Sequence, residues 1–514
     1  MVDVLFASAY SLNCDEKQAR IGRPYPPLGT LLAAALARSL GYTVRVFDAM
    51  LAASIDAFRR ELDAHPARLV VIYEDNFNWQ SKMCLTRMRE RAGEMIRLAR
   101  PHMDAVVCNG SDMSDHPAYY LDAGADAVLL GEGEGTLVEL LPILLAANSA
   151  GMDSVAGLAL PDGDGGFRRT ATRPKLVDLD ALPLPAWDLI DLDRYRSYWR
   201  QRHGFFSLNL ATTRGCPFQC NWCAKPIFGR QYSVRSPENV VEEMKWLETL
   251  ARPDHYWVAD DIFGLVPGWI ERFGELAQAA GLHVPLTVQC RPDLMTEATV
   301  NGLRKAGCTK VWLGAESGSQ SILDAMEKGT TIDQIRQARL RLREAGIECA
   351  FFLQFGYPGE TQREIEMTLD MVRDLMPDDI GISISYPLPG TSFYNRIRAQ
   401  LGDKRNWVDS GDLDMLFAGE YAPEFYRVLH RRVHAEFMTR KALARLGTVG
   451  RRPWRMRPGD VRCLARTVRH GWAWWRLRRR CDQLRKVGPA LTNKAPRLPE
   501  EAFQTGSNLG SSSV

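Results

Sequence analysis

The chain has 514 residues, of which 46% are hydrophobic and 25% charged, and its formal net charge is +3. That length exceeds one ordinary hydrophobic core, so we expect two to three domains of a globular protein. No run approaches the roughly 18 apolar residues of a membrane span, and the start, Met1–Ser8, lacks the basic and apolar parts of a signal peptide. The odd count of 11 cysteines argues against a secreted disulfide framework, so we expect a cytoplasmic protein.

Residues 1–147 alternate apolar runs with helical stretches, and we expect them to form one α/β domain. Five strands followed by helices predict a doubly wound, flavodoxin-like sheet that holds its ligand at the carboxyl ends of the strands. The expected strands are Val2–Ser8, Thr43–Phe47, Leu69–Tyr73, Ala105–Cys108 and Ala127–Leu130.

Three loops of this first unit are candidates for close contact with a ligand, because glycine permits unusual backbone angles and tight approach. A degenerate domain that binds nothing is the alternative. The candidate ligand-binding residues in these loops are Pro27, Leu28, Gly29, Gly110, Ser111, Glu132, Gly133 and Glu134.

Residues 148–200 contain a Leu-Pro-Leu-Pro-Ala-Trp run and are expected to form an extended linker. Residues 201–400 again alternate strands and helices, which predicts a second parallel sheet with right-handed crossovers. Ser236 before Pro237 and Thr331 three residues before Gln334 are helix-start signals. The expected strands are Phe206–Ala211, His255–Ala259, Pro285–Val288, Lys310–Gly314, Glu348–Gln354 and Ile380–Tyr386.

Cys216, Cys220 and Cys223 follow the first strand of this second sheet in a C-x-x-x-C-x-x-C pattern. Three thiolates cannot complete a four-cysteine cluster shell, so a bound cubane iron–sulfur cluster would keep one iron open to a small chelating ligand. The alternatives are a structural zinc site, which requires a fourth Cys or His at ligand spacing, and three unrelated core cysteines. The nearest histidines, His203 and His255, lie in no such pattern.

Polar side chains recur where the later strands of this sheet end: Asp260 and Asp261, then Arg291, then Glu316 and Ser317. The carboxyl ends of parallel strands meet at one edge, so we expect these groups near the cysteine loop. Helix capping explains the two aspartates equally well.

The end of the chain is strongly basic. Residues 401–487 are expected to be helical. Between Arg440 and Lys486 the sequence contains 16 Arg or Lys but only two Asp. The same stretch contains Trp454, Trp472, Trp474 and Trp475. This mixture suits an interfacial membrane helix or, less well, a nucleic-acid surface. A helical subdomain that packs its tryptophans and keeps a solvated basic face is the alternative. Residues 488–514 are polar and expected to be disordered.

The cysteine motif, with Trp222 just before its third cysteine, resembles that of the radical S-adenosylmethionine (SAM) superfamily. The resemblance implies an open (β/α)6 barrel, a [4Fe–4S] cluster held by the three cysteines, SAM bound to the open iron, and a flavodoxin or ferredoxin type electron donor. It also implies SAM contacts from Trp222, Asp260, Asp261, Arg291, Glu316 and Ser317.

The Pro-Pro-Leu-Gly run and the Gly-Glu-Gly-Glu run of the first unit are similar to those of the cobalamin-binding domain fused to one radical SAM subclass. The sequence lacks the D-x-H-x-x-G motif, and the first histidine anywhere is His65, so the cobalt of a bound cobalamin would have no histidine ligand from this domain.

The resemblance favours a cobalamin-dependent methyltransferase that acts on an unactivated carbon of a small-molecule or lipid-like substrate. An oxygen-independent oxidative cyclase of the tetrapyrrole type, with the same cofactors, is the alternative. A methylthiotransferase is disfavoured because Cys14, Cys84 and Cys108 do not fall in its motifs. A non-catalytic cluster-bearing protein is the fourth hypothesis. We expect no nucleic-acid partner and, through the basic C-terminal region, peripheral contact with a membrane.

Overall fold

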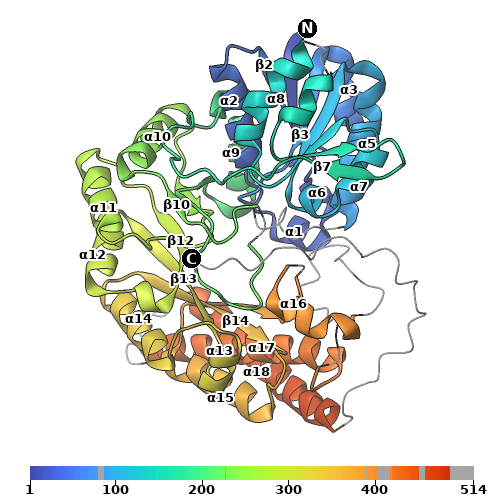
Figure 1. The fold of residues 1–514 in the computed structure, drawn as a ribbon. Coiled ribbons are helices and arrows are strands. Elements are labelled where there is room, and N and C mark those ends of the chain that lie inside the picture. The colour runs from blue at the N-terminus through green and yellow to red at the C-terminus, as the bar shows by residue number, and fades with distance from the viewer. Residues whose placement is uncertain are drawn as a thin grey trace, which may run out of the picture.

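Two large sheets organise the chain: a mainly parallel one built from residues 2–169 and a parallel one built from residues 207–384 (Figure 1). The α/β class expected from the sequence is confirmed, and all eleven expected strands are present with ends within two residues of the prediction. The computed structural model describes residues 1–78, 86–146, 149–225, 227–388, 390–401, 417, 419–450 and 458–486.

The first sheet has the strand order β2-β1-β3-β4-β5-β6-β7, and its first five strands are parallel. Their bounds are β1 Val2–Ser8, β2 Val44–Asp48, β3 Ala67–Tyr73, β4 Ala105–Asn109 and β5 Ala127–Leu129. Side chains alternate between the two faces: Val4 and Phe6 pack against one helical layer, and Leu5 and Ala7 against the other. Helices α2 (Leu28–Ser39) and α8 (Glu134–Leu145) cover the first face. The opposite face packs against α3 (Asp56–Ala64), α5 (Thr86–Ala99), α6 (Ser111–Asp115) and α7 (Pro117–Asp122).

The segment expected to be a linker, residues 148–200, contributes structure to both units. Strands β6 (Leu158–Pro161) and β7 (Phe167–Arg169) extend the first sheet, antiparallel to β5 and to each other. Leu158 and Leu160 are buried, which explains the pairing. Helix α9 (Leu192–His203) then leads into the second sheet.

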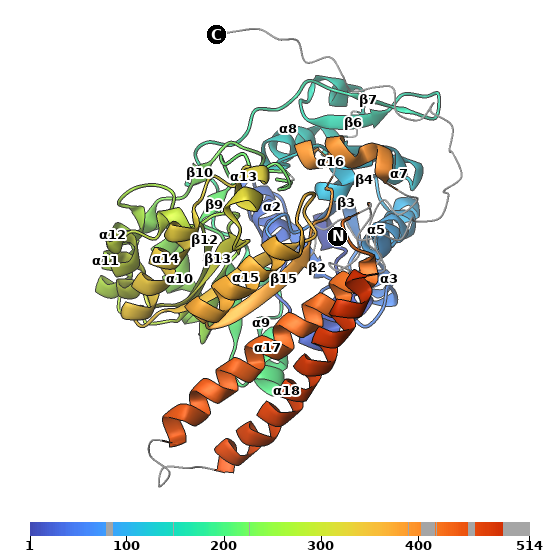
Figure 2. The ribbon, with the colours of Figure 1, turned by 90° about the horizontal axis from the view of Figure 1, so that it is seen from below.

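The second sheet is parallel throughout, with its strands in the order β15-β14-β13-β12-β11-β8. Its strands are β8 Ser207–Leu210, β11 His255–Val258, β12 Leu286–Cys290, β13 Cys308–Glu316, β14 Glu348–Phe355 and β15 Asp379–Ile384. The helices of this unit are α10 Pro237–Leu250, α11 Trp269–Ala279, α12 Glu297–Lys305, α13 Gln320–Ala325, α14 Ile332–Glu344, α15 Gln362–Leu375 and α16 Ser392–Ile397. Figures 1 and 2 show helices lying along the outer side of the curled sheet. Both expected helix starts are confirmed, because Ser236 caps α10 and Thr331 forms a capping box with Gln334 at α14.

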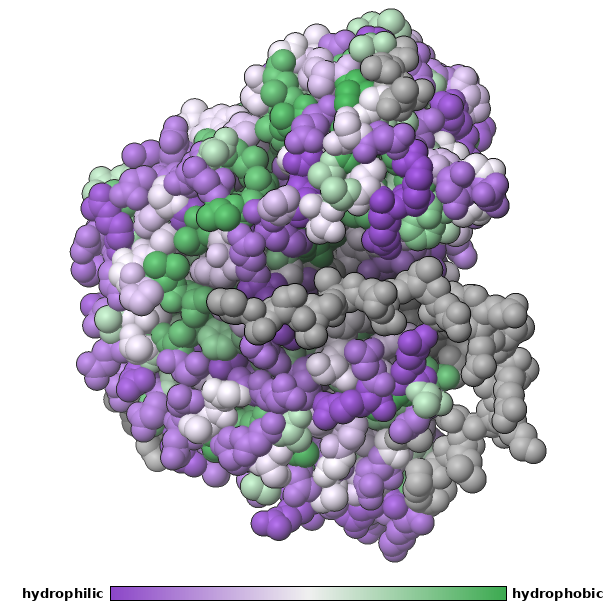
Figure 3. Space-filling view, in the orientation of Figure 1, coloured by the Kyte–Doolittle hydropathy of each residue, from purple (hydrophilic) through white to green (hydrophobic). Residues whose placement is uncertain are grey.

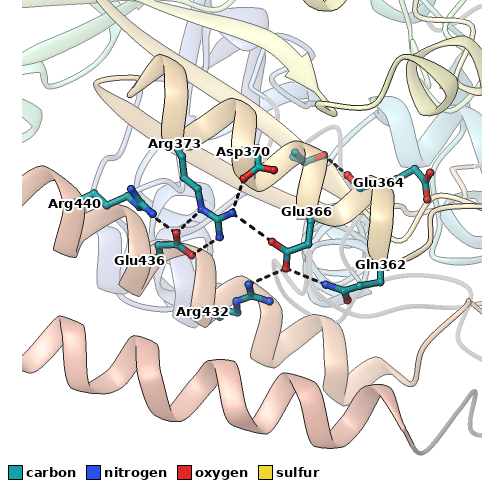
Figure 4. A network of polar contacts seen from close by, with 9 residues as sticks. Gln362, Glu364, Glu366, Asp370, Arg373, Arg432, Glu436 and Arg440 are labelled. Atoms are coloured by element: carbon teal, nitrogen blue, oxygen red, sulfur yellow. Dashed lines mark hydrogen bonds and ion pairs between the residues drawn. The ribbon is translucent and has the colours of Figure 1, made fainter.

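The C-terminal region forms two long helices, α17 (Pro423–Gly450) and α18 (Pro458–Arg485), which lie side by side (Figure 2). Figure 4 shows ion pairs that join α17 to α15: Arg373 Nε lies 2.6 Å from Glu436 Oε1, and Arg432 Nη2 lies 2.9 Å from Glu366 Oε1. These pairs attach the helical region to the outer layer of the curled sheet. The predicted disordered segment, residues 488–514, lies outside the described residues. Among the described helices, none is both long enough and hydrophobic enough to cross a bilayer.

Candidate active site

The three cysteines lie in a loop that a short β-ladder closes. Strand β9 (Thr213–Arg214) pairs antiparallel with β10 (Ser233–Val234), so both ends of the loop are tied at the carboxyl edge of the curled sheet. Gly215 has φ +76°, and a Cβ at this position would collide with the carbonyl oxygen of Gln231. Only glycine fits there without strain, so the backbone turn directly before Cys216 depends on it.

Cys216, Cys220 and Cys223 are free, half-buried thiols. Burial raises the pKa of Cys216, and it raises that of Cys223 to about 12, so these thiols need a positive partner to ionise. Iron supplies that charge, because binding a metal ion displaces the thiol proton. Tetrahedral zinc would bring the sulfur atoms within about 4 Å of one another. Among the described residues, no three His, Cys, Asp or Glu side chains are gathered to hold a single ion. Three cysteines with no fourth Cys or His at ligand spacing in the sequence fit a cluster, in which each cysteine would bind a different iron.

Arg291 places a positive charge beside this loop. Its Nη1 lies 3.9 Å from Cys220 Sγ and donates to the Lys328 carbonyl oxygen at 2.8 Å, and the guanidinium lies 3.6 Å from the centre of the Phe218 ring. Asp293 holds the guanidinium from the other side, with its Oδ1 3.0 Å from Nε. The predicted proximity of Arg291 to the cysteine loop is observed.

Glu316, at the end of β13, is buried and pairs with Lys328, whose Nζ lies 2.8 Å from Glu316 Oε1. Its φ is +57°, a left-handed conformation that costs a residue with a side chain about 1–3 kcal/mol and is most often found at functional sites. Nothing in the sequence singled out Lys328, because it belongs to no motif. Ser317 bonds to Thr368 of α15 at 3.1 Å (Oγ to Oγ1), so its hydroxyl serves local structure.

The two aspartates at the end of β11 have different environments. Asp260 is buried, and its Oδ1 accepts from the N–H groups of Thr212 at 2.7 Å and Thr213 at 3.0 Å. Burial raises its pKa to about 6. Through these bonds Asp260 holds the start of the cysteine loop. Asp261 is exposed.

Two polar atoms close to this cluster are buried and have no partner within the part of the chain that the structure describes: Trp222 Nε1 and Thr330 Oγ1. Thr330 follows Gly329, whose carbonyl oxygen accepts from Arg291. Buried polar groups are nearly always hydrogen-bonded, so each unpaired atom indicates a group that a bound ligand would satisfy. The rim thus offers buried cations, a carboxylate and unpaired donors, which fits a zwitterionic ligand such as SAM.

The candidate loops of the first unit also lie at the carboxyl edge of their sheet. Gly29 N donates to Asp75 Oδ1 at 3.1 Å, and a Cβ on Gly29 would lie 3.0 Å from the Glu74 carbonyl oxygen. The preceding Pro26 carbonyl oxygen accepts from Asn209 Nδ2 of β8 at 3.0 Å. The Pro27–Leu28–Gly29 run therefore begins α2 against the curled sheet.

Gly110 and Ser111 border a small cleft of the first unit, and both are buried. A Cβ on Gly110 would lie 3.1 Å from Glu74 Cβ, and one on Gly133 would lie 2.7 Å from the Tyr73 ring. These glycines are required by protein packing, so they do not by themselves identify a ligand.

Glu132 and Glu134 bind a residue of β9, in the short ladder at the carboxyl edge of the curled sheet. Arg214, two residues before Cys216, lies 3.4 Å from Glu132 (Nη1 to Oε1) and 2.7 Å from Glu134 (Nη2 to Oε1), and all three side chains are buried. The guanidinium also lies near the Phe77 and Phe228 rings. The carboxyl edges of the two sheets therefore face each other across this ion cluster. Sequence reasoning missed Arg214, since only the fold brings it to residues 80 positions away.

Comparison with known proteins agrees with this arrangement. Residues 210–372 match the model of the radical SAM superfamily. An uncharacterized methyltransferase of Pyrococcus horikoshii is 29% identical over 270 residues, which are 52% of this chain and 57% of that protein. The anaerobic magnesium-protoporphyrin IX monomethyl ester cyclase of Rubrivivax gelatinosus is 26% identical over 392 residues, 75% of this chain and 68% of the cyclase.

Among solved structures, the cobalamin-dependent SAM radical enzyme OxsB superposes with a TM-score of 0.70 at 16% identity, covering 93% of this chain and 72% of OxsB. Residues 210–372 thus correspond to a radical SAM domain. Its fold over almost the whole chain is that of OxsB.

Proposed function

We propose that this protein is a cobalamin-dependent radical SAM methyltransferase that methylates an unactivated carbon of a small-molecule substrate. The observation that carries the proposal is the position of the three-cysteine loop: it lies at the carboxyl edge of the curled sheet and is joined by Arg214 to the carboxyl edge of the first unit. On this proposal the first unit is a flavodoxin-like cobalamin domain, and the curled sheet is a partial (β/α)6 barrel.

The chain's own residues have defined tasks in this proposal. Cys216, Cys220 and Cys223 hold a [4Fe–4S] cluster and leave one iron for SAM. Arg291 and the Glu316–Lys328 pair orient the charged groups of SAM, while Trp222 lies against its adenine. When bound, the cluster with SAM supplies a 5′-deoxyadenosyl radical and cobalamin supplies a methyl group, because cofactors carry such chemistry. The protein positions these groups and excludes water.

The alternative, an oxidative cyclase with the same cofactors, is supported by the similarity to the Rubrivivax enzyme across 75% of the chain. Product mass separates the two activities. A methyltransferase adds one CH2 to its substrate, whereas a cyclase removes hydrogens. The experiment is anaerobic reconstitution of the full chain with iron, sulfide and hydroxocobalamin, followed by mass spectrometry of extracts supplied with SAM and a reductant. Absence of 5′-deoxyadenosine would refute both activities.

An electron donor of flavodoxin or ferredoxin type would reduce the cluster.

We also propose that α18 contacts an anionic membrane surface from the cytoplasmic side. Val468, Trp472 and Trp475 are 67%, 59% and 49% exposed, and their spacing puts them on one side of the helix. Arg476 lies 4.6 Å from the Trp472 ring centre, and Arg479 lies 3.9 Å from that of Trp475.

The charge of this segment supports an anionic surface as its partner. Residues 469–486 contain seven Arg or Lys and one Asp. A helix that combines exposed tryptophan with arginine suits the boundary between lipid headgroups and acyl chains, where the ring is buried and the guanidinium meets phosphate. Trp474, by contrast, is half-buried.

A further inference from the structure

The register of the curled sheet gives its two faces opposite characters. Residues paired across parallel strands point to the same side, so the pairing assigns every side chain to a face. One face is apolar and buried throughout, with Leu208, Tyr256, Val288, Leu313, Phe351 and Ile382 as examples. Cys349 and Phe351 of this apolar face share one hydrophobic core with Ala338 and Leu342 of α14, so this face packs against the helices. The other face is therefore the concave, inner one.

Two aromatic rings form a flat surface on the inner face. Trp312 of β13 and Phe352 of β14 stack with ring centroids 4.6 Å apart and planes at 21°, and both are only partly buried. Gly381 of β15 pairs with Phe352 in the register. A Cβ at Gly381 would lie 3.1 Å from Trp312 and 3.2 Å from Phe352, so glycine keeps this part of the surface flat.

Three polar side-chain atoms on this face or just beyond its edge are buried and have no partner among the described residues: Gln354 Oε1, Asn209 Oδ1 and, directly after β15, Ser385 Oγ. These residues are 4%, 2% and 0% exposed. Gln354 lies two positions beyond Phe352 on its strand, and Asn209 pairs with Trp257 of β11. The bond from Asn209 Nδ2 to the Pro26 carbonyl oxygen fixes the amide orientation, so its oxygen is the free atom.

The aromatic surface lies next to the cysteine loop. Trp312 pairs with Gln289 of β12, and Arg291 follows two residues later, directly after that strand and still extended, about 7 Å further along at the rise of a β-strand. Arg291 is the residue whose Nη1 lies 3.9 Å from Cys220 Sγ. A molecule on the rings would thus lie one layer below the proposed SAM site. Figure 3 shows the surface hollowed between the first unit and the curled sheet.

We propose that this inner face binds the substrate, and that the substrate is a flat conjugated ring system carrying N–H or O–H donors. The inference rests on the proposed function, because it assumes that chemistry occurs at the neighbouring rim. A flat ring stacks on Trp312 and Phe352. Its donors satisfy Gln354, Ser385 and Asn209, which a saturated lipid chain would leave unpaired at a cost in free energy.

The binding test uses the full chain and a matched pair of probes, indole and 1-methylindole, which differ only in the ring N–H. We expect equilibrium dialysis to show indole bound more tightly by about fivefold to tenfold, the worth of one hydrogen bond. One of Gln354, Ser385 and Asn209 should accept the indole N–H. The variant that removes this acceptor (Gln354→Leu, Ser385→Ala or Asn209→Leu) should bind indole and 1-methylindole equally. The matched control is Gln362→Leu, whose amide pairs with Glu366 on α15. Equal binding of both probes by the wild-type chain, or a preference that all three variants retain, overturns the proposal.

The second arm measures SAM cleavage by the reconstituted chain in the absence of substrate. The control variant Gln362→Leu should retain both the cluster absorbance and the formation of 5′-deoxyadenosine, and the SAM affinities of Ser385→Ala and Gln354→Leu are compared with that of this control. Loss of SAM affinity in these variants would assign the acceptors to the SAM site and overturn the inference. If the wild-type chain binds indole selectively but does not cleave SAM, the proposed function fails while the ring site stands.

Discussion

Arg214 and Glu134 form a buried ion pair, 2.7 Å from Nη2 to Oε1, between the strand that leads into the cysteine loop and the glycine–glutamate loop of the first unit. A buried arginine is stable only when it is paired, so the position of the cysteine loop depends on the first unit. The cysteine loop and the glycine–glutamate loop, which would hold different cofactors, are thus held together by this buried ion pair.

Replacing Arg214 by leucine should destabilise the protein by about 3–5 kcal/mol, because it leaves Glu132 and Glu134 buried without a cation. Urea unfolding followed by tryptophan fluorescence measures this change. The control is Arg272→Leu, which breaks an ion pair with Glu238 whose side chains are 54% and 53% exposed. That control should cost under about 1 kcal/mol. Equal losses for the two variants would contradict a structural role for the Arg214 cluster.

Replacing Cys220 by alanine should abolish the broad iron–sulfur absorbance and lower bound iron and sulfide to background, with the far-ultraviolet circular dichroism unchanged. Cys308→Ala is the control, since Cys308 is buried in the core of the curled sheet. It should keep its iron. A Cys220 variant that retains a full complement of iron would show that the motif is not the ligand set.

Glu360 should make the protein less stable as pH rises. The side chain is 0% exposed with Oε1 unpaired, and burial raises its pKa from 4.5 to about 8. Between these two values the folded chain holds a proton that the unfolded chain has released, so the stabilising contribution is complete below pH 4.5 and lost as pH rises toward 8.

The variant Glu360→Gln keeps the shape of the neutral acid but does not titrate. We expect its stability relative to wild type to increase between about pH 5 and about pH 8, measured by urea unfolding at intervals across that range. The control is Glu364→Gln, at the start of the exposed first turn of α15. Parallel pH profiles for wild type and Glu360→Gln would place the Glu360 pKa near its ordinary value.

The exposed tryptophans of α18, Trp472 and Trp475, and the arginines beside them predict that the full chain binds phosphatidylglycerol vesicles and not phosphatidylcholine vesicles. The double variant Trp472→Ser, Trp475→Ser should reduce binding by about tenfold or more in a co-sedimentation assay. Val177→Ser, which alters a side chain 71% exposed in the segment between the two sheets, is the control. Binding of single-stranded RNA with no binding of vesicles would replace the membrane by a nucleic acid.

The sequence by itself determined the order and kind of the elements and the three-cysteine motif. Alternating strands and helices depend on local periodicity, and the caps at Ser236 and Thr331 involve residues three positions apart. The cysteine loop is likewise local, since its three cysteines fall within eight residues. Such short-range patterns survive in any one sequence and need no knowledge of the tertiary structure. Strands β6 and β7, in the segment expected to be a linker, were not predicted from the sequence.

Only the tertiary structure decided which distant groups meet. Arg214 reaches Glu134 across 80 positions, and the inner face of the curled sheet is defined by the register of six strands. Lys328 joins Glu316 because a loop returns to the end of β13. Such contacts depend on how the hydrophobic faces of the two sheets pack, which is a property of the whole chain. That packing brings the candidate cofactor and substrate residues to one place.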